Sequence, residues 1–377
     1  MDEIIIGIDV SRGAKTHLSG IEYYSRSIVD AILKSAPKDK VKFRLFSPQP
    51  VDIDAPHGAQ VEIKVMRFPR LWSQLRLAIE TILHPIDVLF VPAHTIPFIA
   101  RGRVVATIHD LGFLRYPALY PLLHRLYHRT CARFSIRRAH RVIAISEFTK
   151  RDILHYYPKT DPRKITVIHQ GLDHARFGPL TKTDSLKYRS RYGEYILFLG
   201  RLEYKKNIHR IVESYASLRQ KYPVISHTLV LGGLPKYGFR AVERYIKTLP
   251  SNIAKDIIIT GYLPDADVPK ILREADLFLF PTLFEGFGLP ILEAFASGVP
   301  VVASNTTSLP EVAGGAAILV DPTNIEEITR ACRKIITNRK LHKILQDMGL
   351  ARCRHFSWDK AGRLTLGVLL GSINNSR

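Results

Sequence analysis

The chain has 377 residues, and close to half of them are apolar, so length and composition predict about two globular domains and exclude a disordered chain. The three cysteines, Cys131, Cys332 and Cys353, are odd in number and far apart, which excludes a disulfide framework or a zinc site and fits a reducing cytosol. The formal net charge of +21 favours anionic partners, without choosing among nucleic acid, acidic lipid and phosphorylated substrates.

The N-terminal residues predict a buried strand. Asp2 and Glu3 precede the apolar run Ile4–Ile8, whereas a signal peptide would begin with basic residues and continue with a longer apolar stretch. No run reaches the roughly 18–20 apolar residues of a membrane span. We expect a cytoplasmic protein, either dissolved or peripheral on the inner face of the cytoplasmic membrane.

Short apolar runs alternate with helix-like stretches along both halves of the chain. They extend from IIIGID at 4–9 to RVIAIS at 141–146, and again from YILFLG at 195–200 to AAILVD at 316–321. Runs without polar alternation are typical of buried parallel strands, and strand–helix alternation is typical of an open α/β sheet. Each half therefore predicts one α/β domain.

A polar stretch with Gly and Pro separates the two halves. Residues 173–194 contain no long apolar run and are interpreted as a linker, so the first domain covers 1–172 and the second 195–355. The tail at about 356–377 is amphipathic, and we expect it to form a last helix that packs back onto the first domain.

The most informative stretch is PTLFEGFGLPILEAFASGVP at 281–300. Gly286 and Gly288 allow the backbone to bend and to approach a ligand closely. Pro290 suits the first position of a helix, where its missing N–H would be unpaired anyway. We therefore expect a helix that begins near Leu289, with an N-terminus that favours a phosphate.

Charged residues follow several of the apolar runs, and ligands of open α/β sheets bind beyond the carboxyl ends of the strands. Arg201 and Lys206 follow one run and supply the positive charge that a departing diphosphate needs. Glu285 precedes the predicted helix and Glu293 lies within it, so the two carboxylates can contact different parts of one ligand. In the first half of the chain, His109 directly follows the apolar run RVVATI.

The run from Glu285 to Glu293 resembles the E-x7-E element of the retaining glycosyltransferases of family 4. Their GT-B fold has two Rossmann-like domains that face a central cleft. The similarity covers most of the chain, is strongest from about 195 to 322, and rests on further segments in the family's order: TIHDLGFLRYP at 107–117, RVIAISEFTKRDI at 141–153, FLGRLEYKKN at 198–207, the stretch 261–304 and SLPEVAGGAAILVDP at 308–322.

The resemblance implies a role for each candidate residue. Arg201 and Lys206 would hold the donor diphosphate, and Glu293 would bind the ribose hydroxyls. Gly20 would lie in a glycine loop of the first domain, although this chain has Ile and Glu after it where the family commonly has more glycine.

The resemblance also implies the residues around the reacting sugar. His109 would face the reacting side of that sugar from the first domain. Glu285 would hold the donor sugar together with the backbone amides of Gly286, Phe287, Gly288 and Leu289. Glu285 and His109 are thus the expected catalytic residues, acting by positioning and stabilisation.

The implied reaction is the transfer of a hexose from a nucleotide sugar to a hydroxyl of a surface glycan or a lipid-linked acceptor, with the anomeric configuration retained. No carboxylate is an obvious covalent nucleophile, so the resemblance implies front-face attack assisted by the leaving diphosphate. The segment around His109 looks most like mannosyltransferases, which makes GDP-mannose the first expectation and a UDP-sugar the second. No metal and no other cofactor are expected.

Two polar segments are interpreted as helix starts. Asp265 and Asp267 are spaced like Mg²⁺ ligands, but LPDADVPKIL is typical of a helix N-terminus capped by Asp. Ser146, before EFTKRDI, is likewise predicted to be an N-cap.

A strongly basic helix is predicted around Arg125–Arg137. Arginines recur there at a spacing of four residues, and Leu122, Leu123, Leu126, Tyr127 and Phe134 supply apolar positions. Such a helix either contacts an anionic membrane surface or covers an ordinary core with a solvated face.

Three alternatives to a glycosyltransferase stay open. A sugar-nucleotide epimerase shares the architecture but needs no acceptor. A catalytically inactive relative would act as a partner subunit, against which the intact set of charged residues argues. A basic nucleic-acid-binding protein would fit the charge, but the chain lacks a helix-turn-helix, zinc-finger or RNP-like signature, so no nucleic acid is expected.

Overall fold

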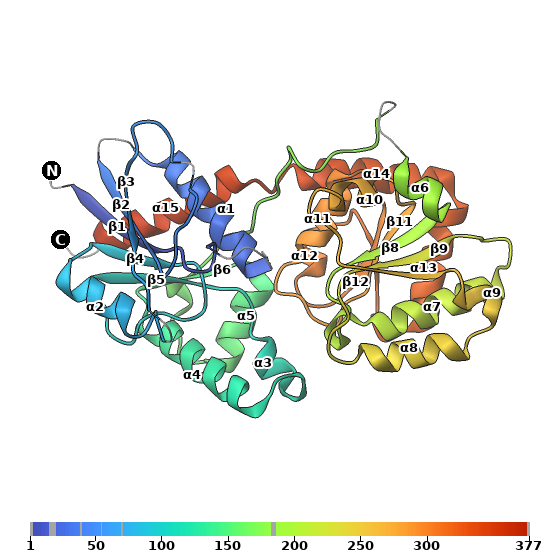
Figure 1. The fold of residues 1–377 in the computed structure, drawn as a ribbon, viewed down its shortest axis with the longest axis horizontal. Coiled ribbons are helices and arrows are strands. Elements are labelled where there is room, and N and C mark those ends of the chain that lie inside the picture. The colour runs from blue at the N-terminus through green and yellow to red at the C-terminus, as the bar shows by residue number, and fades with distance from the viewer. Residues whose placement is uncertain are drawn as a thin grey trace. The chain divides into compact units, whose positions relative to one another are not determined.

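The structure is a computed structural model that describes residues 3–14, 20–37, 40–53, 55–68, 71–181 and 186–374. The chain divides into two compact units: unit 1 comprises residues 1–171 and 356–377, and unit 2 comprises residues 172–355. Each unit contains one parallel sheet with helices packed on it (Figure 1). The predicted fold class, two Rossmann-like α/β domains, is confirmed.

The sheet of unit 1 has the strand order β3-β2-β1-β4-β5-β6-β7, with every pair parallel. The order changes direction between β1 and β4, which is where open α/β sheets bind ligands. The strands are β1 (Ile4–Asp9), β2 (Val41–Ser47), β3 (Gln60–Val65), β4 (Val88–Val91), β5 (Arg103–Ile108), β6 (Arg141–Ala144) and β7 (Ile165–Val167).

Helices cover this sheet. The predicted N-cap is confirmed, because the Ser146 hydroxyl accepts a hydrogen bond from the Thr149 amide at 3.0 Å at the start of α5. The helices are α1 (Gly20–Ser35), α2 (Arg76–Leu83), α3 (Gly112–Arg115), α4 (Leu122–Arg138), α5 (Glu147–Tyr156) and α15 (Trp358–Asn374), with short 3-10 turns at Pro117–Leu119 and Pro162–Lys164.

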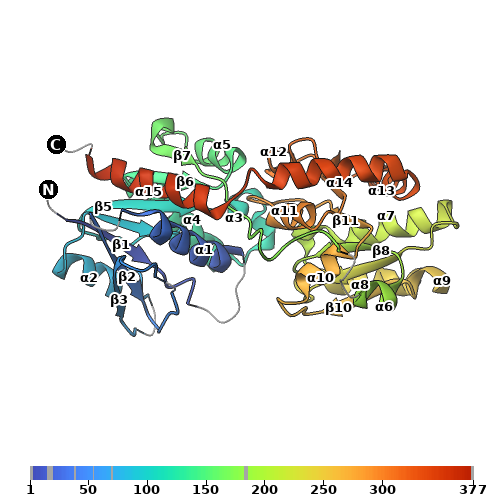
Figure 2. The ribbon, with the colours of Figure 1, turned by 90° about the horizontal axis from the view of Figure 1, so that it is seen from above.

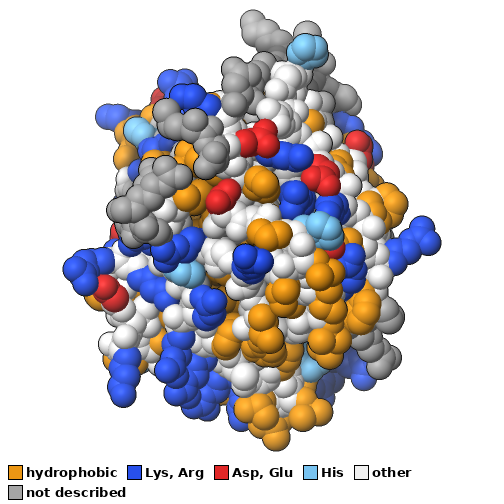
Figure 3. Space-filling view, turned by 90° about the vertical axis from the view of Figure 1, so that its left-hand side faces the viewer, with side chains coloured by type: hydrophobic (Ala, Val, Ile, Leu, Met, Phe, Trp, Pro, Cys, Tyr) orange, Lys and Arg blue, Asp and Glu red, His pale blue; other side chains and the backbone are white. Residues whose placement is uncertain are grey.

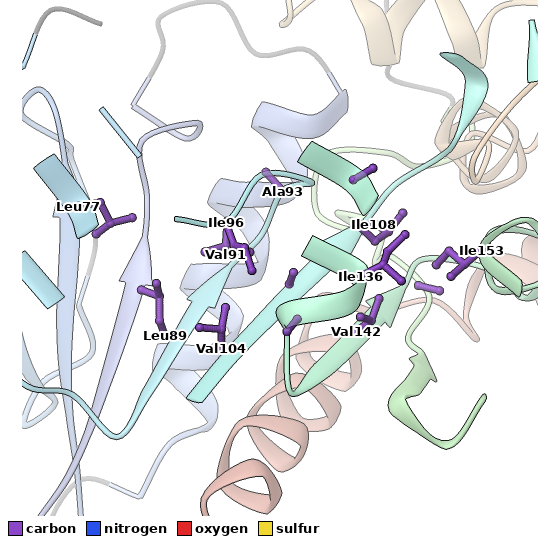
Figure 4. Close-up of a cluster of buried hydrophobic side chains, with 14 of the residues drawn as sticks. Leu77, Leu89, Val91, Ala93, Ile96, Val104, Ile108, Ile136, Val142 and Ile153 are labelled. Atoms are coloured by element: carbon purple, nitrogen blue, oxygen red, sulfur yellow. The ribbon is translucent and has the colours of Figure 1, made fainter. Parts of the chain in front are cut away.

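A hydrophobic core lies between the central strands and the helices of unit 1. Leu89 and Val91 of β4 and Val104 of β5 lie in one buried cluster with Ile136 of α4 and Ile153 of α5 (Figure 4). Apolar residues at successive positions are buried on both faces of these strands, as parallel sheets require. The core thereby fixes the carboxyl ends of β4 and β5, which carry the polar residues described below.

The predicted C-terminal helix is present as α15, and it packs on α1 within unit 1 (Figure 2). Trp358 lies with its ring edge toward Tyr23, at 5.9 Å between centroids. Gly362 lets the two helices approach closely, because a Cβ at this position would lie 2.6 Å from backbone atoms of Ala31 in α1.

The sheet of unit 2 has the order β10-β9-β8-β11-β12-β13 and is also parallel. Its order changes direction between β8 and β11, which predicts the ligand-binding edge. The strands are β8 (Tyr195–Leu199), β9 (Thr228–Gly232), β10 (Ile257–Gly261), β11 (Leu277–Phe280), β12 (Val301–Ser304) and β13 (Ile318–Val320).

The helices of unit 2 alternate with the strands along the chain and pack on this sheet, as in a doubly wound fold. They are α6 (Lys187–Tyr192), α7 (Ile208–Lys221), α8 (Phe239–Thr248), α9 (Ser251–Ala254), α10 (Val268–Arg273), α11 (Leu289–Ala296), α12 (Leu309–Ala313), α13 (Ile325–Thr337) and α14 (Arg339–Cys353), with a 3-10 turn at Tyr204–Lys206.

The stretch 173–194, expected to be a linker, belongs to unit 2 and contains α6. The Glu274 carboxylate accepts hydrogen bonds from the backbone amides of Tyr188 and Arg189 at 2.8 and 2.7 Å. The Tyr188 side chain is buried. A polar helix of this length has no apolar periodicity, so only its tertiary contacts identify it as structured.

The contact between α1 and α15 can be tested with two identical substitutions in one helix. We expect Gly362→Ala to destabilise the protein by about 1–3 kcal/mol, because the new methyl group overlaps the α1 backbone. Gly367→Ala in the same helix adds a methyl group with no atom within 4 Å, and we expect it to stabilise by about 0.5–1 kcal/mol. Urea unfolding of both variants measures the difference, and equal effects would contradict this packing.

Candidate functional site

At the carboxyl end of β8, the backbone at Gly200 lies very close to the backbone at Gly233. Gly200 has a φ of 145°, and a Cβ at Gly233 would lie 1.8 Å from the Gly200 carbonyl oxygen. Only glycine fits at Gly233, because that space is occupied by backbone. The chain can therefore turn at once from β8 into the 3-10 turn that carries Lys206.

Asn207 fixes this turn to the ends of two other strands. Its side-chain amide donates hydrogen bonds to the carbonyl oxygens of Pro281, at 2.8 Å, and Pro322, at 2.7 Å. Asn207 is buried and has a φ of 62°, a left-handed conformation that Asn tolerates better than most residues. Sequence reasoning did not single out Asn207, although an Asn directly before an apolar helix was a usable signal.

Lys206 and Glu285 come together across the β8–β11 change of direction. The Lys206 ammonium forms a hydrogen-bonded ion pair with the Glu285 carboxylate and lies 5.4 Å from the centroid of the Phe280 ring. The Leu283 amide donates to the Lys205 carbonyl at 2.9 Å, which joins the two loops through the backbone. The structure thus brings together one predicted cation and one predicted carboxylate at the strand ends.

Arg201 takes a different partner. Its guanidinium lies 3.4 Å from the Glu203 carboxylate, and Lys205 lies 3.6 Å from the same carboxylate. Arg201 is more than half exposed, with 57% of its side chain accessible, so it can reach toward a ligand. Glu203 was not among the predicted residues, and it holds two cations at this edge of the sheet.

The predicted helix start is confirmed as the N-terminus of α11. Gly288 is the N-cap residue with a φ of 111°, Leu289 is the first helical residue, and Pro290 occupies the first turn. The Ser308 hydroxyl lies 3.0 and 2.7 Å from the carbonyl oxygens of Glu285 and Phe287. The turn from Glu285 to Leu289 is thereby held in one conformation, with Gly286 and Phe287 buried inside it.

Glu293 occupies a poorly hydrated position in α11. Burial raises the pKa of its carboxyl group from 4.5 to about 7, Arg176 opposes that rise, and Asp265 adds to it. The Arg176 guanidinium is itself held by the Asp265 carbonyl oxygen at 2.8 Å. A carboxyl group that is costly to ionise without a ligand is well suited to exchanging hydrogen bonds with hydroxyl groups.

His109 is buried at the end of β5 in unit 1. Its Nε2 lies 3.0 Å from the Pro92 carbonyl oxygen, which can only accept, so Nε2 carries the proton. The ring lies between Tyr24, at 4.7 Å, and His94, at 5.4 Å between centroids. Burial lowers the pKa of His109, and the neutral ring keeps Nδ1 as a hydrogen-bond acceptor.

Gly20 is the first residue of α1, and a Cβ there would have no atom within 4 Å. The backbone at this position therefore does not require glycine. Residues 15–19 of the expected glycine loop lie outside the described residues.

Asp267 does not cap α10 as predicted. It occupies the N-cap position with φ and ψ of −95° and −19°, and its side chain accepts no hydrogen bond from the helix backbone. Its carboxylate instead accepts from the Lys270 ammonium at 3.2 Å and lies 3.5 Å from that of Lys187. Lysine contacts replace the capping bond, which the sequence pattern alone could not indicate.

Neither a metal site nor a membrane-spanning helix is found among the described residues. No group of three or more His, Cys, Asp or Glu side chains in this part of the chain is arranged to hold a metal ion. Among the same residues, no helix has both the length and the apolar composition needed to cross a bilayer.

The basic helix α4 exposes the apolar residues of its N-terminal half. Leu122, Leu123, Leu126 and Tyr127 are all exposed, Leu123 to 78%. The helix is instead anchored by its C-terminal half, where Cys131, Ala132, Ser135 and Ile136 are buried. The helix therefore packs on the core through its C-terminal half and exposes both basic and apolar side chains in its first two turns.

The pKa of Glu293 predicts how stability depends on pH. A folded-state pKa above the unfolded value stabilises the protein below about pH 4.5, and this contribution is lost as the pH rises toward about 7. Glu293→Gln removes the titrating group. We expect the variant to gain about 2–3 kcal/mol relative to the natural protein between about pH 5 and about pH 8. Urea unfolding of both proteins at the two pH values, without ligand, measures their free energies of unfolding. A stability difference that does not change with pH would contradict the prediction.

Comparison with known proteins places both units in one family. The family described as Glycosyl transferases group 1 matches residues 188–350, and that described as Glycosyltransferase Family 4 matches residues 28–176. The chain is 31% identical over 278 residues to the O-antigen chain mannosyltransferase B of Escherichia coli. The aligned region covers 71% of this chain and 70% of that protein.

Solved structures share the fold at low sequence identity. Sucrose-phosphate synthase from Thermosynechococcus elongatus superposes over all of both chains, with a TM-score of 0.75 and 17% identity. Anabaena HepE, solved in complex with UDP, covers 98% of this chain and 100% of its own, with a TM-score of 0.72 and 19% identity. These structures show that the chain has the GT-B fold. The family matches and the Escherichia coli relative show that the chain belongs to the family 4 glycosyltransferases and is a hexosyltransferase.

Proposed function

We propose that the protein transfers mannose from GDP-mannose to a hydroxyl group of a surface glycan or of its lipid-linked precursor, with the anomeric configuration retained. The observation that carries the proposal is the pairing of Lys206 with Glu285 beside the N-terminus of α11. The name of the Escherichia coli relative, an O-antigen chain mannosyltransferase, supports mannose and a polysaccharide product. A UDP-sugar is the second candidate donor.

The donor is proposed to bind at the edge of the unit 2 sheet. Arg201 and Lys206 would hold the diphosphate, since a guanidinium fork and an ammonium both donate charge-assisted hydrogen bonds to its oxygens. The N-terminus of α11 adds a favourable dipole. Glu293 would bind the ribose hydroxyls, which can donate hydrogen bonds to its carboxyl group, whose pKa burial raises to about 7.

The reaction is proposed to proceed on one face of the sugar. The bond from the anomeric carbon to the diphosphate oxygen breaks, and the bond to the acceptor oxygen forms on the same face. The acceptor proton passes to the leaving diphosphate, whose charge Arg201 and Lys206 stabilise. Glu285 would hold the sugar hydroxyls, and His109 would accept a sugar hydrogen bond at Nδ1, because its Nε2 is engaged by Pro92.

The site of action is proposed to be the inner face of the cytoplasmic membrane. A lipid-linked acceptor is confined to a membrane, and α4 combines exposed leucines with arginines. Between residues 111 and 146 the sequence contains seven arginines and no acidic residue. Apolar side chains with flanking positive charge favour an anionic lipid surface.

Glu285 is tested by Glu285→Gln, which keeps the shape of the side chain and removes its charge. We expect turnover at saturating donor to fall about 10²–10³-fold, because a group that stabilises the reacting sugar is lost. Glu326→Gln is the matched control, since Glu326 pairs with Lys221 on the surface of unit 2 and should leave turnover unchanged. Unchanged turnover in Glu285→Gln would refute this role.

The donor is tested by thermal shift with GDP, UDP, ADP and their sugars. GDP-mannose should raise the melting temperature most, since a ligand at 100 times its dissociation constant adds about 2.7 kcal/mol. Lys206→Ala should weaken donor binding about 10–100-fold, because a charge-assisted hydrogen bond to the diphosphate is lost. Consumption of the nucleotide sugar without any acceptor would instead indicate an epimerase, and an inverted product would refute retention.

A further inference from the structure

Helix α2 of unit 1 has apolar side chains on opposite sides. Leu77 and Ala78 are buried against the core, while Leu75, Ile79, Ile82 and Leu83 are exposed, Ile79 to 48% and Leu83 to 65%. The exposed positions follow the spacing i, i+4, i+7 and i+8, so they form one stripe along the helix. A helix that is apolar all round is normally buried, and this stripe has no protein covering it among the described residues.

Neighbouring segments extend the stripe into a larger surface. The Phe98 amide donates to the Gln74 side chain at 2.9 Å, which places the exposed pair Phe98 and Ile99 beside the start of α2. The Phe98 ring packs edge-on against Phe134 of α4, at 4.8 Å between centroids. We call this surface the α2 face; its exposed residues are Leu71, Leu75, Ile79, Ile82, Leu83, Phe98 and Ile99.

One residue of the α2 face has an unusual backbone. Leu71 has a φ of 54°, in the left-handed region that leucine rarely adopts, and its side chain is exposed. Such strain concentrates at functional positions. Figure 3 shows hydrophobic side chains gathered on the lower part of this side of the molecule, next to Lys and Arg side chains.

Basic residues border the α2 face, and the carboxylate of the helix itself is buried. Glu80 is the acidic residue of α2, and it is buried against three basic groups: Lys64 at 2.8 Å, Arg76 at 2.9 Å and His84 at 2.9 Å. Arg101 and Arg103 follow Phe98 and Ile99 along the chain, and one exposed carboxylate, Asp87, lies shortly after the end of α2. An apolar surface with a cationic rim is complementary to anionic lipid.

We infer that the α2 face inserts into the headgroup region of an anionic lipid bilayer, with its aliphatic side chains in the acyl boundary and Arg101 at the lipid phosphates. The inference rests on the proposed membrane location and assigns the inserting surface.

The experiment compares sedimentation of the full chain with vesicles of phosphatidylcholine alone and of phosphatidylcholine with phosphatidylglycerol. We expect binding to the anionic vesicles that weakens as salt is added. The double variant Ile79→Ser/Leu83→Ser should bind at least about tenfold more weakly, because two exposed aliphatic side chains no longer insert.

The matched control is Ile344→Ser/Met348→Ser, which removes two comparably exposed apolar side chains from α14 in unit 2 and should bind like the natural protein. Equal binding of the α2 and control variants would overturn the inference. A loss confined to Leu122→Ser/Leu123→Ser would also overturn it, while leaving the proposed membrane location intact. A dimer that the α2 variant dissociates, seen by light scattering, would overturn it in favour of self-association. Mannosyl transfer to a water-soluble acceptor tests the proposed function separately.

Discussion

The candidate site depends on the side chain of Asn207, which ties the ends of three strands together. Its amide holds the carbonyl oxygens of Pro281 after β11 and Pro322 after β13, while its backbone continues the turn that follows β8. Lys206 precedes Asn207, and Glu285 lies four residues beyond Pro281. Asn207 thus joins the segments that carry Lys206 and Glu285 at the sheet edge, and its buried amide satisfies two backbone carbonyl groups there.

Charges at this edge are arranged before any ligand arrives. Glu203 holds Arg201 and Lys205, and Glu285 holds Lys206, so each cation is kept near the strand ends by a carboxylate. A diphosphate in the proposed position would compete with these carboxylates for the same donors. Prearranged charge of this kind stabilises developing negative charge with little reorganisation.

The two units use burial in complementary ways. In unit 2, burial raises the pKa of the Glu293 carboxyl group to about 7, and in unit 1 burial lowers the pKa of the His109 ring. Both shifts favour the uncharged form of the side chain. On the outside of unit 1, α2 and α4 expose aliphatic side chains, while Glu80, the acid of α2, is buried and paired with basic groups.

The sequence by itself determined the two parallel sheets, the start of α11 and the N-cap at Ser146, because apolar runs, proline, glycine and serine act through local sterics and hydrogen bonds. It also indicated Lys206 and Glu285 through a family resemblance. Only the tertiary structure decided that α6 belongs to unit 2, that Asp267 contacts lysines instead of capping α10, and that Asn207 joins three strand ends. Which apolar stripe of α2 or α4 is buried was decided there too, since periodicity gives a helix its faces but not its neighbours.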